Sequence, residues 1–379
     1  MKKEEIIKMR IKRVEKEIRD TPYDKASEHH HGKLKAKLSK LKEELSGVFS
    51  GGGGGGGGYA IKHSGDATIV LVGPPSVGKS TLLNQLTNAE SKVGNYDFTT
   101  LGVVPGMMKY KGVRVQILDL PGLLKGAFEN KGFGKRVLSV IRASDLVVLM
   151  TDVKRPEWID KMENEISKAG IRLNEEKPKI VIRKMPRGAI QVVDSCNGLG
   201  KEVIISVVKE MGYSNAVVSF DEKIEDVEKL IDALTKSRKY LPMVKVVNKI
   251  DDLKNLNLKF KISSFAKAME DKQNSKFKDV VCVSAEKGLG LDEFKEKIWE
   301  KLGLVRIFLK KERNKSADKS DPLIIKKDRR LDDVLNKISG EMRGDIKRAY
   351  IWGKKAKFAG QGVSLRMEVF DEMEVWFGR

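Results

Sequence analysis

The stretch Gly73-Pro74-Pro75-Ser76-Val77-Gly78-Lys79-Ser80-Thr81 decides the fold. It contains the pattern Gly-x-x-x-x-Gly-Lys-Ser and follows the apolar run 68–72 directly. In such a loop, glycines let backbone N–H groups turn toward phosphates, the lysine reaches the β- and γ-phosphates, and the serine hydroxyl binds magnesium. We therefore expect 73–81 to bind a nucleotide, with Lys79 as a catalytic residue and Ser80 as a magnesium ligand.

A second phosphate-side motif, Asp119-Leu-Pro-Gly122, ends the apolar run 113–118. An Asp-x-x-Gly sequence alone is also a common turn, so its position at the end of a strand matters. Open α/β sheets bind ligands at the carboxyl edge of their strands. We expect Asp119 to hold magnesium through water and the backbone N–H of Gly122 to contact the γ-phosphate during catalysis.

Two further motifs specify the base. Asn248-Lys249-Ile250-Asp251 follows the apolar run 244–247, and Ser284-Ala285 follows the run 280–283. A carboxylate such as that of Asp251 accepts hydrogen bonds from guanine N1–H and the exocyclic amine, a donor pair that adenine lacks. We expect Lys249 to lie along the base plane and Ser284-Ala285 to offer a backbone N–H to guanine O6. GTP and GDP are the predicted ligands, and the intact guanine motif argues against an ATPase.

The segment Tyr96-Asp-Phe-Thr-Thr-Leu101 lies between the two phosphate motifs. A threonine in this loop closes on magnesium and the γ-phosphate in the triphosphate state. Thr100 is the preferred metal ligand and catalytic residue, with Thr99 as the alternative. Leu123 stands where many GTPases carry the glutamine that orients the attacking water. We expect slow hydrolysis that is stimulated by a partner. Potassium is a second candidate for this stimulation, because Ser76 stands where some cation-dependent GTPases carry asparagine.

The charge of the chain points to a polyanionic partner. Its 379 residues carry a formal net charge of +21. With 40% hydrophobic residues, a chain of this length can form the cores of two to four domains. Such an excess favours RNA or a ribonucleoprotein surface, and no feature indicates DNA specificity. The only two cysteines, Cys196 and Cys282, imply neither a disulfide framework nor a zinc site. Without a membrane-length apolar run or a signal peptide, the expected location is the cytoplasm.

The first fifty residues are charge-dense, with apolar residues at helical spacing. Thr21-Pro22 interrupts the pattern, which predicts a helical hairpin over 1–50. His29-His30-His31 falls in what the pattern indicates is a polar connector, and we expect no metal there. The eight glycines 51–58 predict either a flexible tether of roughly 15 Å or a packed glycine coil.

From residue 67 the pattern alternates between strands and helices. The strands of a mostly parallel sheet are expected at 68–72, 113–118, 146–150, 244–247 and 280–283.

The region 171–240 has its own β-β-α-β-α order and predicts an inserted domain. Its first two strands, 180–183 and 189–193, are expected to form a hairpin around Pro186-Arg-Gly188. Strand-like and helical segments after residue 304 fit a small β-grasp domain.

With these motifs, the chain resembles the Obg superfamily and, within it, the developmentally regulated GTP-binding protein (DRG) family. The more specific stretches that carry the resemblance are Ala26-Ser-Glu-His-His-His-Gly-Lys-Leu-Lys-Ala-Lys-Leu38, the glycine run, Tyr96 to Leu101, Gly170-Ile-Arg-Leu-Asn174 and Trp352-Gly353.

The resemblance implies an α/β P-loop GTPase domain over 66–170 and 241–303. An α+β domain like domain 2 of ribosomal protein S5 would interrupt it at 171–240, and a C-terminal TGS domain of β-grasp fold would occupy 304–379. Family members are associated with ribosomes and translation and have a dedicated regulatory partner protein. A hydrophobic residue at the Leu123 position is a feature of the superfamily. Lys125 and the long segment 253–278 depart from the family pattern.

Two functional hypotheses result. The first is a GTP-hydrolysing, ribosome-associated translation factor with basic accessory domains. The alternative is a GTP-gated RNA-binding or ribosome-assembly scaffold in which hydrolysis is incidental.

Overall fold

The computed structural model describes residues 3–24, 27–49, 64–87, 103–120, 133–193, 198–252, 280–338, 346 and 348–378. The chain divides into two compact units, one formed by 1–60 with 167–240 and the other by 61–166 with 241–379. The glycine run, the segment 96–101, Gly122, Leu123 and the segment 253–278 lie outside the described residues. What was predicted for them stays a prediction.

A six-stranded sheet organises the larger unit, with strand order β11-β10-β4-β1-β3-β2. Neighbouring strands are parallel except the pair β2–β3 at one edge. All five predicted strands are present, whereas β2 was not predicted. The bounds are β1 Ala67–Val72, β2 Val104–Tyr110, β3 Val113–Asp119, β4 Leu146–Asp152, β10 Met243–Asn248 and β11 Val280–Cys282.

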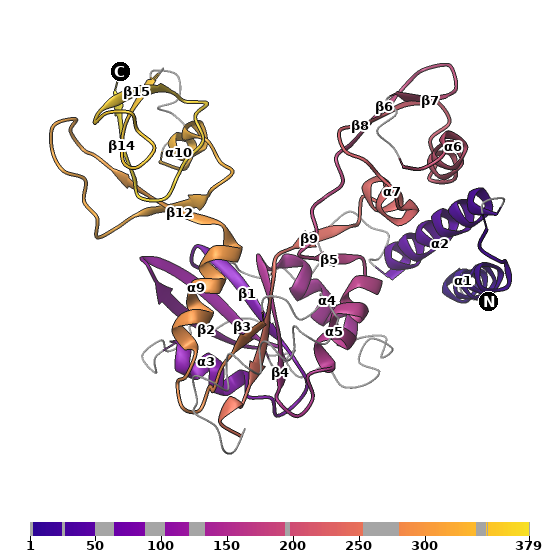
Figure 1. The fold of residues 1–379 in the computed structure, drawn as a ribbon, viewed down its shortest axis with the longest axis horizontal. Coiled ribbons are helices and arrows are strands. Elements are labelled where there is room, and N and C mark those ends of the chain that lie inside the picture. The colour runs from indigo at the N-terminus through magenta and orange to yellow at the C-terminus, as the bar shows by residue number, and fades with distance from the viewer. Residues whose placement is uncertain are drawn as a thin grey trace. The chain divides into compact units, whose positions relative to one another are not determined.

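Both faces of this sheet are covered, which explains the continuous apolar runs of β1, β4 and β10. Figure 1 shows α3 and α9 on one side and α4 and α5 on the other. The helices are α3 Lys79–Thr87, α4 Phe133–Ala143, α5 Trp158–Lys168 and α9 Leu291–Leu302, with the short 3-10 helix η2 at Ile250–Asp252.

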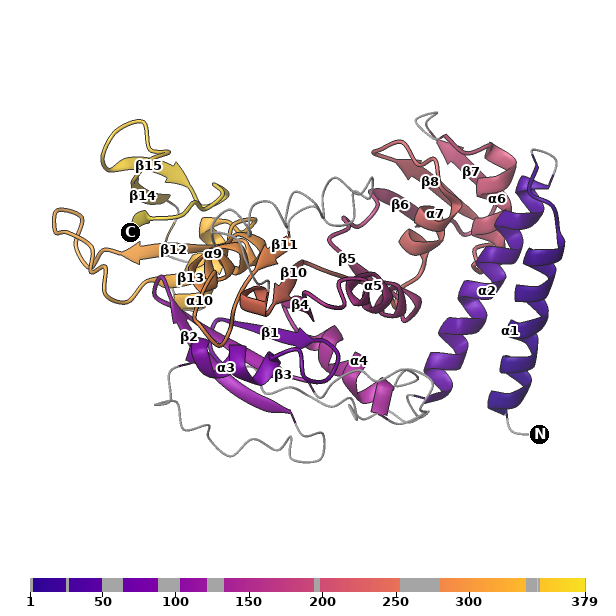
Figure 2. The same ribbon diagram turned by 60° about the horizontal axis from the view of Figure 1, so that its bottom comes forward.

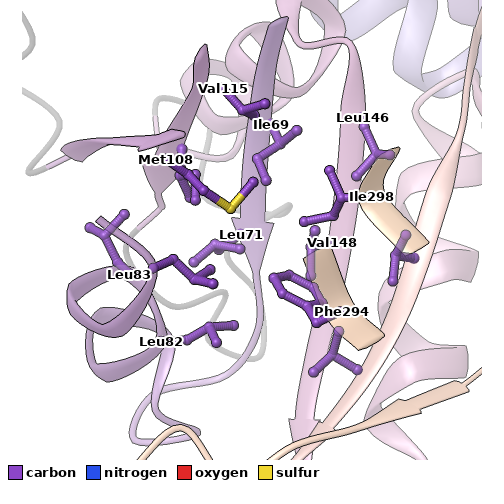
Figure 3. Packing of buried hydrophobic residues seen from close by; sticks show 14 of the residues in the cluster. Ile69, Leu71, Leu82, Leu83, Met108, Val115, Leu146, Val148, Phe294 and Ile298 are labelled. Atoms are coloured by element: carbon purple, nitrogen blue, oxygen red, sulfur yellow. The ribbon is translucent and has the colours of Figure 1, made fainter. Parts of the chain in front are cut away.

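The core under α3 and α9 is drawn in Figure 3. Ile69 and Leu71 of β1 lie between Leu82 and Leu83 of α3 on one side and Phe294 of α9 on the other, all at most 2% exposed. Each such side chain contributes about 1.5–3 kcal/mol through removal from water. Because α3 begins at the phosphate-loop lysine, this packing fixes the loop against the sheet.

The larger unit continues into a second, five-stranded sheet with strand order β13-β12-β16-β14-β15. The pair β12–β16 is parallel and the other three pairs are antiparallel. One face packs on α10. The bounds are β12 Leu304–Leu309, β13 Leu323–Lys326, α10 Leu331–Ile338, β14 Arg348–Trp352, β15 Gln361–Ser364 and β16 Met373–Gly378.

The smaller unit begins with the predicted helical hairpin, α1 Lys3–Asp20 and α2 Glu28–Phe49. Figure 2 shows the two helices side by side. Ala36 of α2 is buried in one cluster with α6 and α7, and the Ser39 hydroxyl lies 3.3 Å from that of Thr235. The remaining elements are β5 Ile171–Leu173, β6 Ile180–Lys184, β7 Ile190–Val193, α6 Lys201–Glu210, β8 Ala216–Phe220, α7 Val227–Leu234 and β9 Lys239–Leu241.

Two local predictions are wrong. Strands β6 and β7 form no hairpin, because β8 lies between them, antiparallel to β6 and parallel to β7. The buried, alternating strand β8 takes the central place, and the segment 185–189 is long enough to cross two strand spacings of about 4.8 Å each. His29–His31 belong to the first turns of α2, and His31 is 5% exposed with its Nε2 3.1 Å from the Thr21 carbonyl oxygen.

None of the helices in the described ranges is long and apolar enough to cross a membrane. Within the same ranges, no group of histidine, cysteine, aspartate and glutamate side chains has the arrangement of a metal centre.

Candidate nucleotide-binding site

The motifs predicted to bind nucleotide meet at the carboxyl edge of the six-stranded sheet. Leu71 of β1 is in register with Asp119 of β3, and Asn248 of β10 is in register with Asp152 of β4. The loop 73–78 leaves β1 at this edge, and Ser284 follows β11 next to β10. Parallel pairing in this strand order therefore brings segments separated by more than two hundred residues to one place.

The phosphate loop has a backbone that glycine makes possible. Gly78 has φ +93°, and a Cβ there would collide with the side-chain amide of Asn248. A Cβ on Gly73 would collide with the carbonyl oxygen of Met150 on β4. Because α3 starts at Lys79, its first backbone N–H groups have no partner within the helix and face the loop, an arrangement that favours the binding of an anion.

Lys79 and Asp119 form the buried charged centre of the site. The Lys79 ammonium donates to the carbonyl oxygens of Gly73 and Pro74 at 3.1 and 3.2 Å, and the residue is 7% exposed. Burial lowers the pKa of Lys79, against the opposing charge of Asp119. Burial also raises the pKa of Asp119, against the hydrogen bond from Ser80 and the charge of Lys79.

Ser80 and Asp119 offer the oxygen atoms that magnesium prefers. The Ser80 hydroxyl donates to Asp119 Oδ2 at 2.6 Å. The other carboxylate oxygen, Oδ1, is buried and has no hydrogen-bond partner among the described residues. Buried polar atoms are rarely left unpaired, so an oxygen of this kind fits a cation or its bound water. The two residues therefore fit magnesium; the third predicted ligand, Thr100, lies outside the described residues, as does Gly122.

Asn248 connects the phosphate loop to the base-recognition loop. Its side-chain amide donates to the Val77 carbonyl oxygen at 2.8 Å and accepts from the Ala285 backbone N–H at 2.9 Å. The N–H predicted to reach guanine O6 is thus bonded to Asn248 in this structure, and guanine would have to share or displace that bond. Ser284 is fully buried, and its hydroxyl accepts from the Lys287 N–H at 3.2 Å.

Lys249 and Asp251, the residues predicted to contact the base, lie directly after β10 and in η2. Lys249 has φ +61°, a left-handed conformation that turns the chain sharply out of β10. Asp251 lies in η2 with a side chain 13% exposed, and its ion pair with Lys287 is long, 3.9 Å.

Asp152 is a site residue that the sequence analysis missed. It ends β4, is 4% exposed and accepts from the Arg155 guanidinium at 2.7 Å, while Arg155 reaches the Pro75 carbonyl oxygen at 3.5 Å. Burial alone would raise the pKa of Asp152, but Arg155, the Lys154 N–H and the charge of Lys249 lower it. Asp152 is thus connected to the phosphate loop through Arg155 and lies in register with Asn248 of the guanine motif. An acidic residue two positions after the end of the predicted strand 146–150 was the available signal.

Two family models match consecutive parts of the chain. Residues 68–185 match the model described as "50S ribosome-binding GTPase". Residues 187–304 match the model described as "C-terminal region of MMR_HSR1 domain".

Several curated proteins are similar over nearly the whole chain. An uncharacterised GTP-binding protein of Methanocaldococcus jannaschii is 42% identical over 96% of this chain and 91% of its own length. Ribosome-interacting GTPase 1 of Saccharomyces cerevisiae is 36% identical over 96% of each chain. Developmentally-regulated GTP-binding protein 2 of Homo sapiens is 34% identical over 94% of each chain.

Proposed function

Because the chain belongs to the family of developmentally regulated GTP-binding proteins, we propose that it hydrolyses GTP to GDP and phosphate in association with the ribosome. The observation that carries this proposal is the convergence of all described motifs at one sheet edge, where Asn248 connects the loop that binds phosphate to the loop that binds guanine. GTP binding follows from the family; hydrolysis and the ribosomal role are the proposal.

In the proposed mechanism, Ser80 and Asp119 hold magnesium, which when bound supplies positive charge to the β- and γ-phosphates. Lys79 exchanges the carbonyl oxygens of Gly73 and Pro74 for phosphate oxygens, and the first N–H groups of α3 hold the phosphates in line. Thr100 and the Gly122 N–H complete the γ-phosphate site. Because Leu123 brings no amide to orient water, turnover is slow until a partner or potassium contributes.

In this proposal, the regions 171–240 and 304–379 dock the protein on the ribosome. The order β13-β12-β16-β14-β15, with the parallel pair β12–β16 and one packed helix, supports the assignment of 304–379 as a β-grasp TGS domain. The segment 171–240 serves as the S5 domain-2-like insertion. A net charge of +21 favours ribosomal RNA as the surface contacted. A dedicated regulatory protein and a cytoplasmic location complete the proposal.

The decisive experiment measures GTP turnover with and without purified ribosomal particles, in sodium and in potassium, over a series of salt concentrations. We expect stimulation by the particles and its steep loss with added salt, because phosphate contacts release counterions. Lys79→Ala should abolish turnover, whereas Lys154→Ala, which removes the same charge from a side chain 74% exposed near the same edge, should retain it.

Turnover that ribosomal particles leave unchanged in both cations would contradict a translation GTPase. If GTP then altered the affinity for ribosomal particles, the scaffold hypothesis would be favoured.

A further inference from the structure

A polar pocket of about 520 Å³ lies on the five-stranded sheet, away from the nucleotide site. It is lined by Lys310, Arg313, Asn314, Trp352, Ala359 and Gly360. These residues come from the segment after β12 and from the end of β14 with the segment that follows it. We propose that this pocket binds an unpaired nucleotide of single-stranded RNA. The inference rests on the proposed ribosomal function and specifies how one pocket of the protein would contact RNA.

The pocket lies on the sheet face opposite α10. On β14, Ala349 and Ile351 are fully buried in the core with α10, so the alternating residues Tyr350 and Trp352 face the other way. Trp376 of β16 packs beside Tyr350, with ring centroids 5.3 Å apart. The outer face is therefore built from aromatic rings, although a solvent-facing sheet surface usually carries polar side chains.

Cations lie directly on these rings. The Lys310 ammonium is 3.9 Å from the Trp352 ring centroid, and the Arg313 guanidinium is 4.2 Å from that of Tyr350. The Lys310 side chain is only 7% exposed, yet its ion pair with Glu374 is long, 3.9 Å, and Glu374 also pairs with Lys319 at 3.6 Å. A buried cation with a distant, shared counterion is well placed to bind a phosphate.

The surroundings extend the same chemistry. Phe358, next to the pocket residue Ala359, is 64% exposed, which is unusual for a large aromatic side chain. The two segments 310–322 and 353–360 together carry eight basic and three acidic residues. Arg313 and Phe358 are planar groups on which a base stacks, Asn314 has an amide for its polar edge, and Lys310 offers a charge for its phosphate.

This combination favours RNA with unpaired bases over other ligands. A double helix keeps its bases stacked inside and would use the charges but not the aromatic groups. An acidic peptide would likewise need the charges alone. A small apolar ligand does not suit a lining with two cations and an amide.

The test measures fluorescence anisotropy of a labelled single-stranded RNA of about ten uridines with the full-length chain, a length in the range that one such platform binds. Arg313→Ala and Phe358→Ala each change an exposed side chain and should weaken binding about tenfold, which corresponds to ~1.4 kcal/mol, within the range for loss of one stacked base. Lys315→Ala is the matched control: it removes one charge from the same segment, but Lys315 pairs with Glu312 at 2.6 Å and does not line the pocket. We expect this control to change the affinity less than about threefold.

Three results would overturn the inference: equal weakening by Lys315→Ala and Arg313→Ala, equal affinity for a duplex of the same charge, or more effective competition by polyglutamate than by unlabelled RNA. GTP turnover with ribosomal particles, measured on the same variants, separates the two proposals. If stimulation persists while RNA affinity is unaffected by Arg313→Ala and Phe358→Ala, the pocket inference fails and the proposed function stands.

Discussion

At the scale of single residues, the nucleotide site holds charges in an environment that disfavours them. Lys79 and Asp119 are both buried. Burial lowers the pKa of Lys79 and raises that of Asp119, which in both cases favours the neutral side chain. Lys79 is bonded to carbonyl oxygens of its own loop, and Asp119 keeps one buried oxygen unpaired among the described residues. A magnesium nucleotide offers each a charged partner, so binding relieves an electrostatic cost that the fold already carries.

In the proposed site, base selection depends on the carboxylate of Asp251. Asp251→Asn should weaken guanine nucleotide binding at least ~100-fold, because the amide places a donor where guanine also donates. The same variant should gain affinity for xanthine nucleotides, whose oxygen accepts from that amide. Equilibrium titration with fluorescent GDP and XDP measures both effects. Asp252→Asn, at the next position of η2, is the control and should bind GDP normally; unchanged GDP affinity in Asp251→Asn would refute the assignment.

The missed residue Asp152 predicts a pH dependence. Its pKa lies below the ordinary value of 3.8, so its charge stabilises the fold above that pH, and this contribution is lost as the pH falls through the lowered pKa. Asp152→Asn should reduce the free energy of unfolding by about 1–3 kcal/mol at pH 7, and the difference from wild type should shrink below about pH 4. Thermal unfolding followed by circular dichroism over this pH range tests it.

Asp328→Asn, at an exposed carboxylate, is the control for this experiment. A difference between wild type and Asp152→Asn that stayed constant into acid would show that the charge of Asp152 is not the stabilising feature.

At the scale of elements, a buried ionic triad joins parts of the smaller unit. Asp232 of α7 is 7% exposed and accepts from Arg172 of β5 at 2.5 and 2.9 Å and from Arg238 at 2.6 Å. Arg238 also donates to Ser39 of α2 at 3.2 Å. Arg172 is the arginine of Gly170-Ile-Arg-Leu-Asn174, so this family-like stretch has a structural role: it connects the β5–β9 ribbon to α7 and, through Arg238, to the N-terminal hairpin.

Removing the shared carboxylate should loosen these elements together. Asp232→Ala leaves two largely buried guanidinium groups without their partner and should cost about 3–5 kcal/mol. Hydrogen exchange should then quicken in α2, α7 and β5 while the six-stranded sheet stays protected. The control is Glu225→Ala, which breaks a solvent-exposed pair with Lys223 and should leave exchange unchanged. Faster exchange confined to α7 would mean that the triad connects nothing beyond its own helix.

At the scale of the whole larger unit, the C-terminal sheet shares its core with the nucleotide-binding sheet. Ile324 of β13 is 4% exposed and belongs to the same buried cluster as Ile69 and Phe294, whereas Ile325 packs toward the α10 core. Adjacent residues of one strand therefore serve two cores, because side chains alternate between the faces of a sheet. Sequence position alone assigns both residues to the tail.

This alternation predicts different effects of two equal truncations. Ile324→Ala should destabilise the nucleotide-binding sheet by about 2–4 kcal/mol, and Ile325→Ala should affect mainly the five-stranded sheet. Hydrogen exchange of peptides from β1, β4 and β14 distinguishes the two outcomes. If both variants loosened only β14, the cores would be independent.

The sequence by itself determined the nucleotide chemistry and most of the elements. The phosphate loop, Asp119 and the guanine motif can be recognised in the sequence because each requires particular residue types at fixed local spacing. The five parallel strands can be recognised because burial on two faces requires continuous apolar runs. The helical hairpin is equally local.

Only the tertiary structure decided the relations between distant segments. It inserted β8 between β6 and β7, placed Asp152 beside Lys249, bonded the Ala285 N–H to Asn248 and divided neighbouring residues of β13 between two cores. Each depends on which surfaces pack together across tens to hundreds of residues. Local periodicity indicates that a side chain is buried, but which residues pack against it depends on the free energy of the whole fold.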